Sequence, residues 1–271
     1  GILSEAIGRL ENMTLEENRA ALEAGKEKMK GAGMERILPD AEKQGEYVVD
    51  TARAEELCRE YFSEYSIDSY QCVGETVNHS YAAYNVQGYD KNGSMLFAEI
   101  DRMSGKLVGF DYYEDCSAEN FDIDNAKRIA EEFLQKQGYE DMTAVRFSQS
   151  GSTTDFTFVY EKDGVAYYPD AVRVKVCRSR GVVSGMNATR YLRNHKERGE
   201  VNAKITMEKA YDKLSDKLTV EASRLAVVQT ARGERTAYEF LCSYEEANYF
   251  VYIDAETGEE ISIVNVQNIR W

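Results

Sequence analysis

The chain has 271 residues, of which 43% are hydrophobic and 30% are charged, a composition typical of a globular protein and not of a disordered one. Its 33 basic and 48 acidic residues give a net charge of −15, which disfavours nucleic acid or an anionic membrane surface as a partner. The sequence contains no transmembrane run and no secretory leader, but it begins at Gly1 and not at Met. We therefore expect any membrane attachment to come from a segment that is not present in this chain.

Residues 1–46 predict a helical lead-in. Leu3, Ile7 and Leu10 recur at helical spacing, and Thr14-Leu15-Glu16-Glu17 resembles a capping box. Three glycines and a proline then end the helical pattern.

Three later segments predict the start of a helix, each with an apolar residue, a capping side chain and then an alanine four positions after the cap. The predicted caps are Asp50, Asp122 and Thr206. Their side-chain oxygens can accept hydrogen bonds from the free N–H groups of the first turn, and loss of such a cap costs about 1 kcal/mol. Apolar residues follow at helical spacing, so one face of each helix should pack on a sheet.

A strand, a short turn with a glycine and a second strand recur three times at nearly constant spacing. A loop built on a type I turn needs positive φ at its last residue, and an Asp at the start can accept hydrogen bonds from loop N–H groups. The second copy has Cys177 where the others have Asp. The residues that we assign to these turns are Asp101, Gly105, Gly181, Asp254, Thr257 and Gly258.

Further strand-like segments lie between each helix and its hairpin, for example residues 81–86 and 156–160, with turn signals at Asn92-Gly93 and Asp163-Gly164. Consecutive strands joined by short loops are antiparallel. We predict an α+β fold with three tandem units, each an α-helix packed on a sheet of about four antiparallel strands. The expected boundaries are 1–46 for the lead-in and 47–117, 118–196 and 197–271 for the units.

These helix starts and hairpins resemble the PepSY domain, and residues 249–259 (YFVYIDAETGE) are the closest match. The first unit keeps Asp101, Ser104 and Gly105, whereas the second is divergent at Cys177. Three such units behind a helical region resemble the C-terminal region of the YpeB family of spore-germination proteins, and the resemblance covers about residues 47–271.

The resemblance implies a non-catalytic protein of the spore or cell envelope, at the spore inner membrane or cortex, without a cofactor. It also implies a partner of the SleB type, a cortex-lytic peptidoglycan hydrolase that the chain would stabilise or restrain. Two alternatives stay open, a peptidoglycan-binding or glycan-binding module and a PepSY-type peptidase inhibitor.

A search for enzyme chemistry gives no convincing site. The two histidines, His79 and His195, lie in different predicted units and in no metal-binding spacing. Paired carboxylates such as Glu131-Glu132 fit a solvated face, and Gly31-Ala32-Gly33 lacks the context of a phosphate loop. We predict no catalytic and no metal-binding residue, although a triad dispersed in the sequence stays open. An enzyme would require a deep pocket with converging titratable groups.

Tyrosine is the one strong compositional excess, with 19 residues. Tyrosines on a strand either cover a thin core or present a binding face, because the ring offers contact area and the hydroxyl a hydrogen bond. The candidate interaction surface consists of Tyr112, Tyr113, Tyr167, Tyr168, Tyr249 and Tyr252.

The five cysteines are odd in number and show no ligand spacing, so at least one must be free or intermolecular. We interpret them as mostly buried small hydrophobic residues that do not fix the redox compartment. A basic cluster between Arg190 and Arg198 is interpreted as a solvated linker between the second and third units, and anchoring of an acidic face of a neighbouring unit stays open as an alternative.

Overall fold

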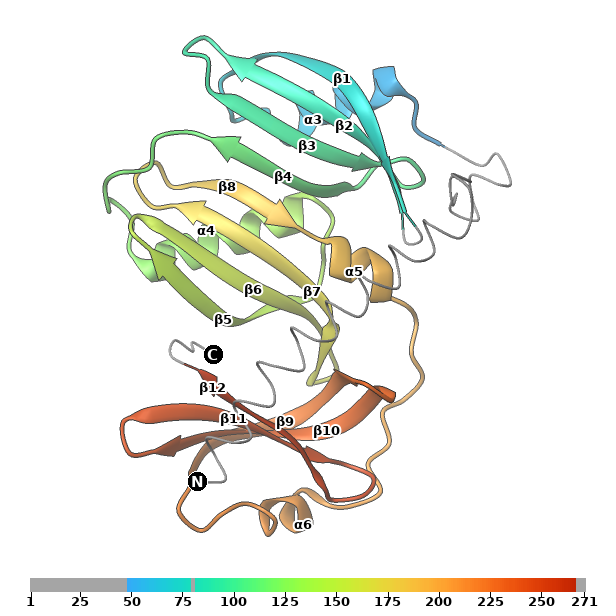
Figure 1. The fold of residues 1–271 in the computed structure, drawn as a ribbon, viewed down its shortest axis with the longest axis vertical. Helices are drawn as coiled ribbons and strands as arrows, with labels where there is room; N and C mark the ends of the chain where they lie inside the picture. The colour runs from blue at the N-terminus through green and yellow to red at the C-terminus, as the bar shows by residue number, and fades with distance from the viewer. Residues whose placement is uncertain (1–47, 79–80, 267–271) are drawn as a thin grey trace, which may run out of the picture. The chain divides into compact units, whose positions relative to one another are not determined.

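The structure is a computed structural model that describes residues 48–78 and 81–266 (Figure 1). The expected helical lead-in, residues 1–46, and His79 lie outside the described residues. The described helices are α3 (Thr51–Tyr61), α4 (Ile123–Lys136), α5 (Thr189–Asn194) and α6 (Met207–Tyr211). The first strands are β1 (Ile67–Val77), β2 (Ala82–Asp90), β3 (Met95–Asp101), β4 (Leu107–Tyr113), β5 (Met142–Ser150) and β6 (Thr153–Lys162). They are followed by β7 (Val165–Cys177), β8 (Val182–Asn187), β9 (Thr219–Thr230), β10 (Gly233–Tyr244), β11 (Ala247–Asp254) and β12 (Glu260–Val266).

This element order makes the chain an α+β protein with a large β-sheet and few helices. The described residues form two compact units. The N-terminal unit consists of residues 48–162 and 167–197, and the C-terminal unit consists of residues 163–166 and 198–266.

The sheet of the N-terminal unit runs in the order β1-β2-β3-β4-β8-β7-β6-β5. Its two halves join where β4 pairs antiparallel with β8, with Gly109 opposite Asn187 and Asp111 opposite Gly185. A Cβ atom on Gly109 would lie only 2.8 Å from the carbonyl oxygen of Met186. Glycine therefore lets the two backbones approach closely enough to continue the sheet.

Helices α3 and α4 cover one face of this sheet, behind the strands in the view of Figure 1. Helix α3 contacts β1, β2 and β3, whereas α4 contacts β5, β6 and β8. Both helices bury side chains in one continuous core, among them Ala54 and Ala130, and Ile100 from β3 and Val174 from β7 belong to the same core. Described residues from the first two predicted units thus lie in a single core.

Each long hairpin is tied to the start of a helix by the same contact. The apolar residue before the cap donates its N–H to a carbonyl in the hairpin turn, and the cap side chain accepts from the first helical turn. The backbone pairs are Val49 to Arg102 (3.1 Å), Phe121 to Arg178 (3.0 Å) and Ile205 to Ala255 (3.0 Å). The cap oxygens of Asp50, Asp122 and Thr206 accept from the N–H groups of Arg53 (2.8 Å), Asn125 (2.8 Å) and Lys209 (3.3 Å).

The turn glycines lie in the left-handed region, with φ of 71° at Gly105, 65° at Gly181 and 77° at Gly258. Each donates its N–H to the carbonyl four residues earlier. The carboxylate of Asp101 accepts from the N–H of Ser104 (2.8 Å), and that of Asp254 accepts from the N–H groups of Glu256 (2.8 Å) and Thr257 (3.0 Å).

The electrostatics of Asp254 follow from this turn. Burial alone would raise the pKa of its carboxyl group, but the hydrogen bonds from Thr257 and Glu256 and the ion pair with Arg235 outweigh burial and lower the pKa. The carboxylate is thus held in its charged form at neutral pH.

The change Gly258→Ala is expected to destabilise the C-terminal unit by about 1 kcal/mol or more, because a Cβ atom would be forced into positive φ. The matched control is Gly199→Ala in the same unit, where φ is not positive and no atom lies within 4 Å of the added Cβ. Thermal melts of both variants measure the effect. Equal melting temperatures for the two variants would contradict the assigned role of the turn.

The C-terminal unit contains α6 and the antiparallel strands β9, β10, β11 and β12. Its core includes Ala210, Phe240 and Ile253. The helix expected after the Thr206 cap is short, because α6 ends at Tyr211. The following Asp and Ser residues are poor helix formers, and the hydroxyl of Ser215 accepts from the N–H of Lys217 (3.4 Å).

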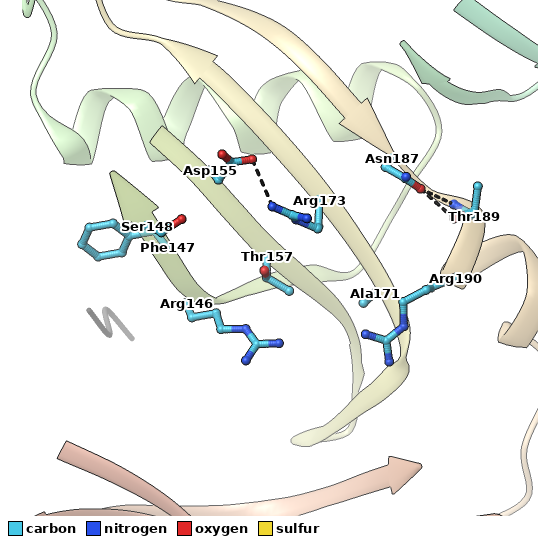
Figure 2. Close-up of a pocket in the computed structure, with 10 residues that line it drawn as sticks. All are labelled: Arg146, Phe147, Ser148, Asp155, Thr157, Ala171, Arg173, Asn187, Thr189 and Arg190. Atoms are coloured by element: carbon cyan, nitrogen blue, oxygen red, sulfur yellow. Dashed lines mark hydrogen bonds and ion pairs between the residues drawn. The ribbon is translucent and has the colours of Figure 1, made fainter. Parts of the chain in front are cut away.

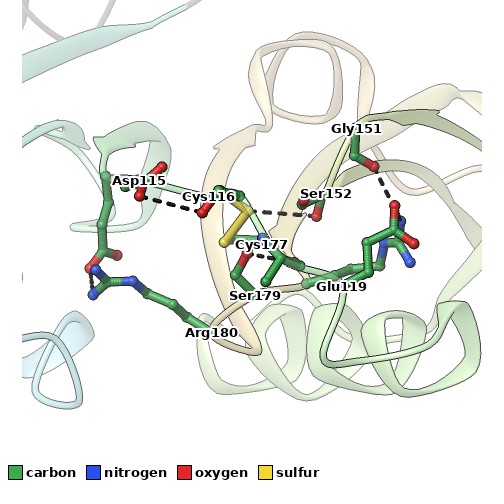
Figure 3. The surroundings of a disulfide bond; sticks show 12 residues. Asp115, Cys116, Glu119, Gly151, Ser152, Cys177, Ser179 and Arg180 are labelled. Carbon is green, nitrogen blue, oxygen red and sulfur yellow. Dashed lines mark hydrogen bonds and ion pairs between the residues drawn. A yellow bond between two sulfur atoms is a disulfide. The ribbon is translucent and has the colours of Figure 1, made fainter.

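A disulfide joins Cys116 to Cys177, which corrects the interpretation of these two residues as buried small hydrophobes (Figure 3). It ties the loop after β4 to the β7–β8 turn. The same loop is held by hydrogen bonds from Ser179 to Ala118 (2.5 Å) and from Asn120 to the carbonyl of Ser179 (2.8 Å). The remaining cysteines are free, Cys58 and Cys242 buried and Cys72 half-buried.

Candidate interaction surface

The face of the N-terminal sheet opposite α3 and α4 is the candidate site. Side chains alternate along a strand, so residues next to those of the core point to this open face. On β3, Leu96 and Ile100 enter the core and Phe97 points away from it; on β7, Val172 and Val174 enter the core and Arg173 points away. The alternation of side chains along each strand therefore determines both which residues form the core and which lie on the open face.

The half of the open face on β1–β4 carries exposed apolar side chains. We call Val73, Tyr89, Phe97 and Tyr113 the aromatic patch; Val73 is 52% exposed, Phe97 37% and Tyr113 59%. The rings of Phe97 and Tyr113 contact edge to face, with centroids 6.3 Å apart. A cluster of exposed apolar side chains of this kind is typical of an interaction site.

Two neighbouring cavities hollow the open face. One of about 500 Å³ lies beside the aromatic patch and is lined by Phe97 and Gly109 among others. The second, of about 540 Å³, lies over β5–β8 and is lined by several arginines (Figure 2). Asn187 and Thr189 line both, so the two cavities adjoin where β4 meets β8.

The cavity over β5–β8 is basic. Arg146, Arg173 and Arg190 line it, and Asp155 lies 3.5 Å from Arg173. Arg190 donates a hydrogen bond to the carbonyl of Tyr168 (3.3 Å). Figure 2 shows the guanidinium groups of Arg146 and Arg190 pointing toward each other across the cavity.

The surroundings of Arg190 disfavour its positive charge. Partial desolvation first, and then repulsion from Arg146 and Arg193, lower the pKa of this guanidinium below its usual value. The group stays charged at neutral pH, because arginine starts from a very high pKa. The cavity therefore concentrates positive charge in a chain whose net charge is −15.

The predicted tyrosine surface needs correction. Tyr112, Tyr167 and Tyr252 are buried, and the hydroxyl groups of Tyr112 and Tyr252 donate to Asp90 (3.2 Å) and Glu239 (2.7 Å). Neighbouring residues on a strand point to opposite faces, so Tyr112 and Tyr113, or Tyr167 and Tyr168, do not share one face.

Of the other three, only Tyr113 belongs to the aromatic patch, while Tyr168 and Tyr249 are half-buried. Phe97 and Arg146 were not predicted from the sequence. Arg190, which was assigned to a linker, lies on α5 beside the cavity. Strand alternation around Leu96 and Ile100 was the signal for Phe97.

The side chains that line the site are suited to binding and include few that could act in catalysis. Within residues 48–78 and 81–266, no group of three or more His, Cys, Asp or Glu side chains could hold a metal ion. His195 lies 2.8 Å from the buried carboxylate of Asp170 and stacks on Tyr191, outside both cavities. Aromatic rings beside guanidinium groups are instead the side chains enriched where proteins bind other proteins.

Comparison with known proteins identifies the family. Residues 21–201 match the family model for the YpeB sporulation PepSY1 and PepSY2 domains. The chain belongs to the YpeB sporulation family. Residues 204–264 match the model for the peptidase propeptide and YPEB domain, which confirms the PepSY resemblance.

Curated relatives include the sporulation protein YpeB of Halalkalibacterium halodurans, 31% identical over 63% of this chain, and that of Bacillus subtilis, 26% identical over 65%. The matched region spans about two fifths of the length of these YpeB relatives, 38% and 40% respectively. The solved Bacillus megaterium YpeB C-terminal domain superposes with a TM-score of 0.75 at 26% identity, covering 81% of this chain and 99% of that domain. The fold is therefore that of a YpeB C-terminal domain.

None of the helices in the described part of the chain has the length and apolar character needed to span a membrane.

Proposed function

We propose that this chain is a non-catalytic, protein-binding module of the spore envelope that holds a peptidoglycan hydrolase of the SleB type through the open face of its N-terminal sheet. The observation that carries the proposal is the aromatic patch beside two adjoining cavities, on the sheet face opposite α3 and α4. The relatives are sporulation proteins, which supports a role in the spore.

The architecture that we propose is three tandem PepSY-like units with boundaries near residues 117 and 196. The contact between a helix start and a hairpin turn, repeated three times, supports this division. The first two units act as one body, because they share a core and a continuous sheet. A rigid surface loses less conformational entropy on binding, which favours stable docking of a partner.

The mechanism is steric. Exposed rings such as Phe97 and Tyr113 anchor the partner at the centre of the contact, and the polar residues around them exclude water. The docked hydrolase is either stabilised or occluded, and measuring its activity with and without this chain separates the two roles.

Location outside the cytoplasm is part of the proposal. The Cys116–Cys177 disulfide supports it, because disulfides persist in oxidising compartments and are rare in the cytosol.

Co-purification of the full-length protein with its full-length cortex-lytic hydrolase tests the proposal. Phe97→Ala combined with Tyr113→Ala is expected to weaken binding about tenfold or more, because aromatic anchors dominate such contacts. Tyr211→Ala is the matched control, since this ring is 52% exposed in the C-terminal unit. Absence of any interaction between the wild-type proteins would refute the proposal, and equal losses in both variants would refute the assigned surface.

A second candidate is binding of peptidoglycan, favoured by the exposed Tyr113 ring, whose face is suited to stacking on a sugar. Sedimentation with purified cell wall distinguishes it. If wild-type protein sediments and Tyr113→Ala does not, while the hydrolase fails to co-purify, this second function replaces the first.

A further inference from the structure

We propose that the cavity lined by Arg146, Arg173 and Arg190 binds the carboxylate groups of an acidic peptide segment. This inference rests on the proposed function only for the identity of the protein that supplies the segment.

Two like charges converge in the cavity. Arg146 reaches the cavity from β5 and Arg190 from α5, and their guanidinium groups point toward each other (Figure 2). Within the described part of the chain, neither guanidinium forms an ion pair with a carboxylate; Arg190 meets only the carbonyl of Tyr168. Because two cations repel each other, this arrangement is stabilised when an anion lies between them.

The balance of charge in the cavity also favours an anionic ligand. Among the described residues, Arg173 is the one lining arginine with a carboxylate beside it, Asp155 at 3.5 Å. Two positive charges are therefore left for a ligand. Guanidinium groups bind carboxylates through paired N–H donors, which gives both strength and orientation.

The size and the lining of the cavity favour a peptide over a free inorganic ion. A volume of about 540 Å³ is in the range of sites for organic ligands and far exceeds what one phosphate ion needs. Phe147 and Ala171 add apolar surface to the lining, and Ser148 and Thr157 add hydroxyl groups that can bond a peptide backbone. An extended segment with acidic side chains uses all three kinds of group.

The test is fluorescence anisotropy of a labelled peptide with three consecutive glutamates, blocked at both ends, against the full chain at low ionic strength. A peptide with three glutamines is the matched probe. Arg146→Ala and Arg190→Ala are each expected to weaken binding of the acidic peptide about tenfold or more, since each removes a charge-assisted hydrogen bond. Arg128→Ala is the control, because this arginine is exposed on α4 and pairs with Glu132 on the opposite side of the sheet.

Each outcome decides the inference. Equal affinity for the two peptides, or equal losses in Arg128→Ala and Arg146→Ala, overturns it. If inorganic phosphate displaces the acidic peptide at a concentration equal to that of the peptide, the cavity is a site for free oxyanions and the proposal of a peptide ligand is refuted. Thermal melts show that each variant is folded, and Arg146→Lys, which keeps the charge but loses the paired donors, is expected to bind between wild type and Arg146→Ala. If the acidic peptide binds but the hydrolase does not co-purify, the inference holds and the proposed function is refuted. If the hydrolase co-purifies but the acidic peptide does not bind, the proposed function holds and the inference is refuted.

Discussion

Reduction of the Cys116–Cys177 disulfide is expected to lower the free energy of unfolding of the N-terminal unit by about 4 kcal/mol. The two cysteines are 61 residues apart, and a cross-link of that length removes much of the conformational freedom of the unfolded chain. In a unit of this size the loss corresponds to a fall in melting temperature on the order of 10 °C. Thermal melts with and without dithiothreitol measure it.

The variant Cys116→Ser separates the disulfide from other effects of the reductant. It should melt at the temperature of the reduced wild type and should no longer respond to dithiothreitol. Cys72→Ser is the matched control, because Cys72 is free and half-buried. Titration of the denatured, unreduced wild type should find three free thiols; five free thiols would contradict the disulfide.

The disulfide also explains how the second hairpin differs from the other two. Asp101 and Asp254 close their turns by accepting hydrogen bonds from loop N–H groups, whereas Cys177 at the same position has no carboxylate. The backbone bond from Gly181 to Cys177 keeps the turn, and the side chain serves to hold the loop after β4. Cys177, which departs from the Asp of the other two turns, thus forms a long-range cross-link.

Local features of the fold were predictable from the sequence because each is encoded within a few residues. The cap at Asp50 and the positive φ at Gly258 depend on neighbours close in the chain. The single core of the N-terminal unit and the pairing of β4 with β8 depend on residues far apart. One signal for that pairing was present, because Gly109 and Gly185 lie within strands, where glycine often marks a close approach of backbones.

The candidate site was predicted poorly because tyrosines were grouped by abundance and not by face. Period-two alternation places Tyr112 toward the core and Tyr113 on the open face, next to Phe97. The basic cavity combines Arg146 from β5 with Arg190 from α5, and only the order of strands in the sheet brings them together. No spacing in the sequence predicts that Arg146 and Arg190 line the same cavity.

Loss of the guanidinium in Arg224→Met is expected to destabilise the C-terminal unit by about 3 kcal/mol. Glu239 on β10 is fully buried and lies opposite Arg224 on β9 and Tyr252 on β11. Its carboxylate accepts from Arg224 (2.7 Å) and from the hydroxyl of Tyr252 (2.7 Å). A buried carboxylate that loses a charged donor keeps its desolvation cost, so breaking such a pair costs far more than breaking an exposed one.

Urea denaturation of Arg224→Met measures this cost, and Arg128→Met is the matched control. Arg128 forms an ion pair of the same length, 2.7 Å, with Glu132 on the exposed surface of α4, so its loss should change stability by only about 0.5 kcal/mol. The double variant Arg224→Met with Glu239→Met is expected to be more stable than Arg224→Met, because it removes the buried charge together with its partner. The contrary result is a double variant that is less stable than both Arg224→Met and Glu239→Met. It would show that the Glu239 carboxylate stabilises the unit even without Arg224, and would refute loss of the ion pair as the cause of the destabilisation.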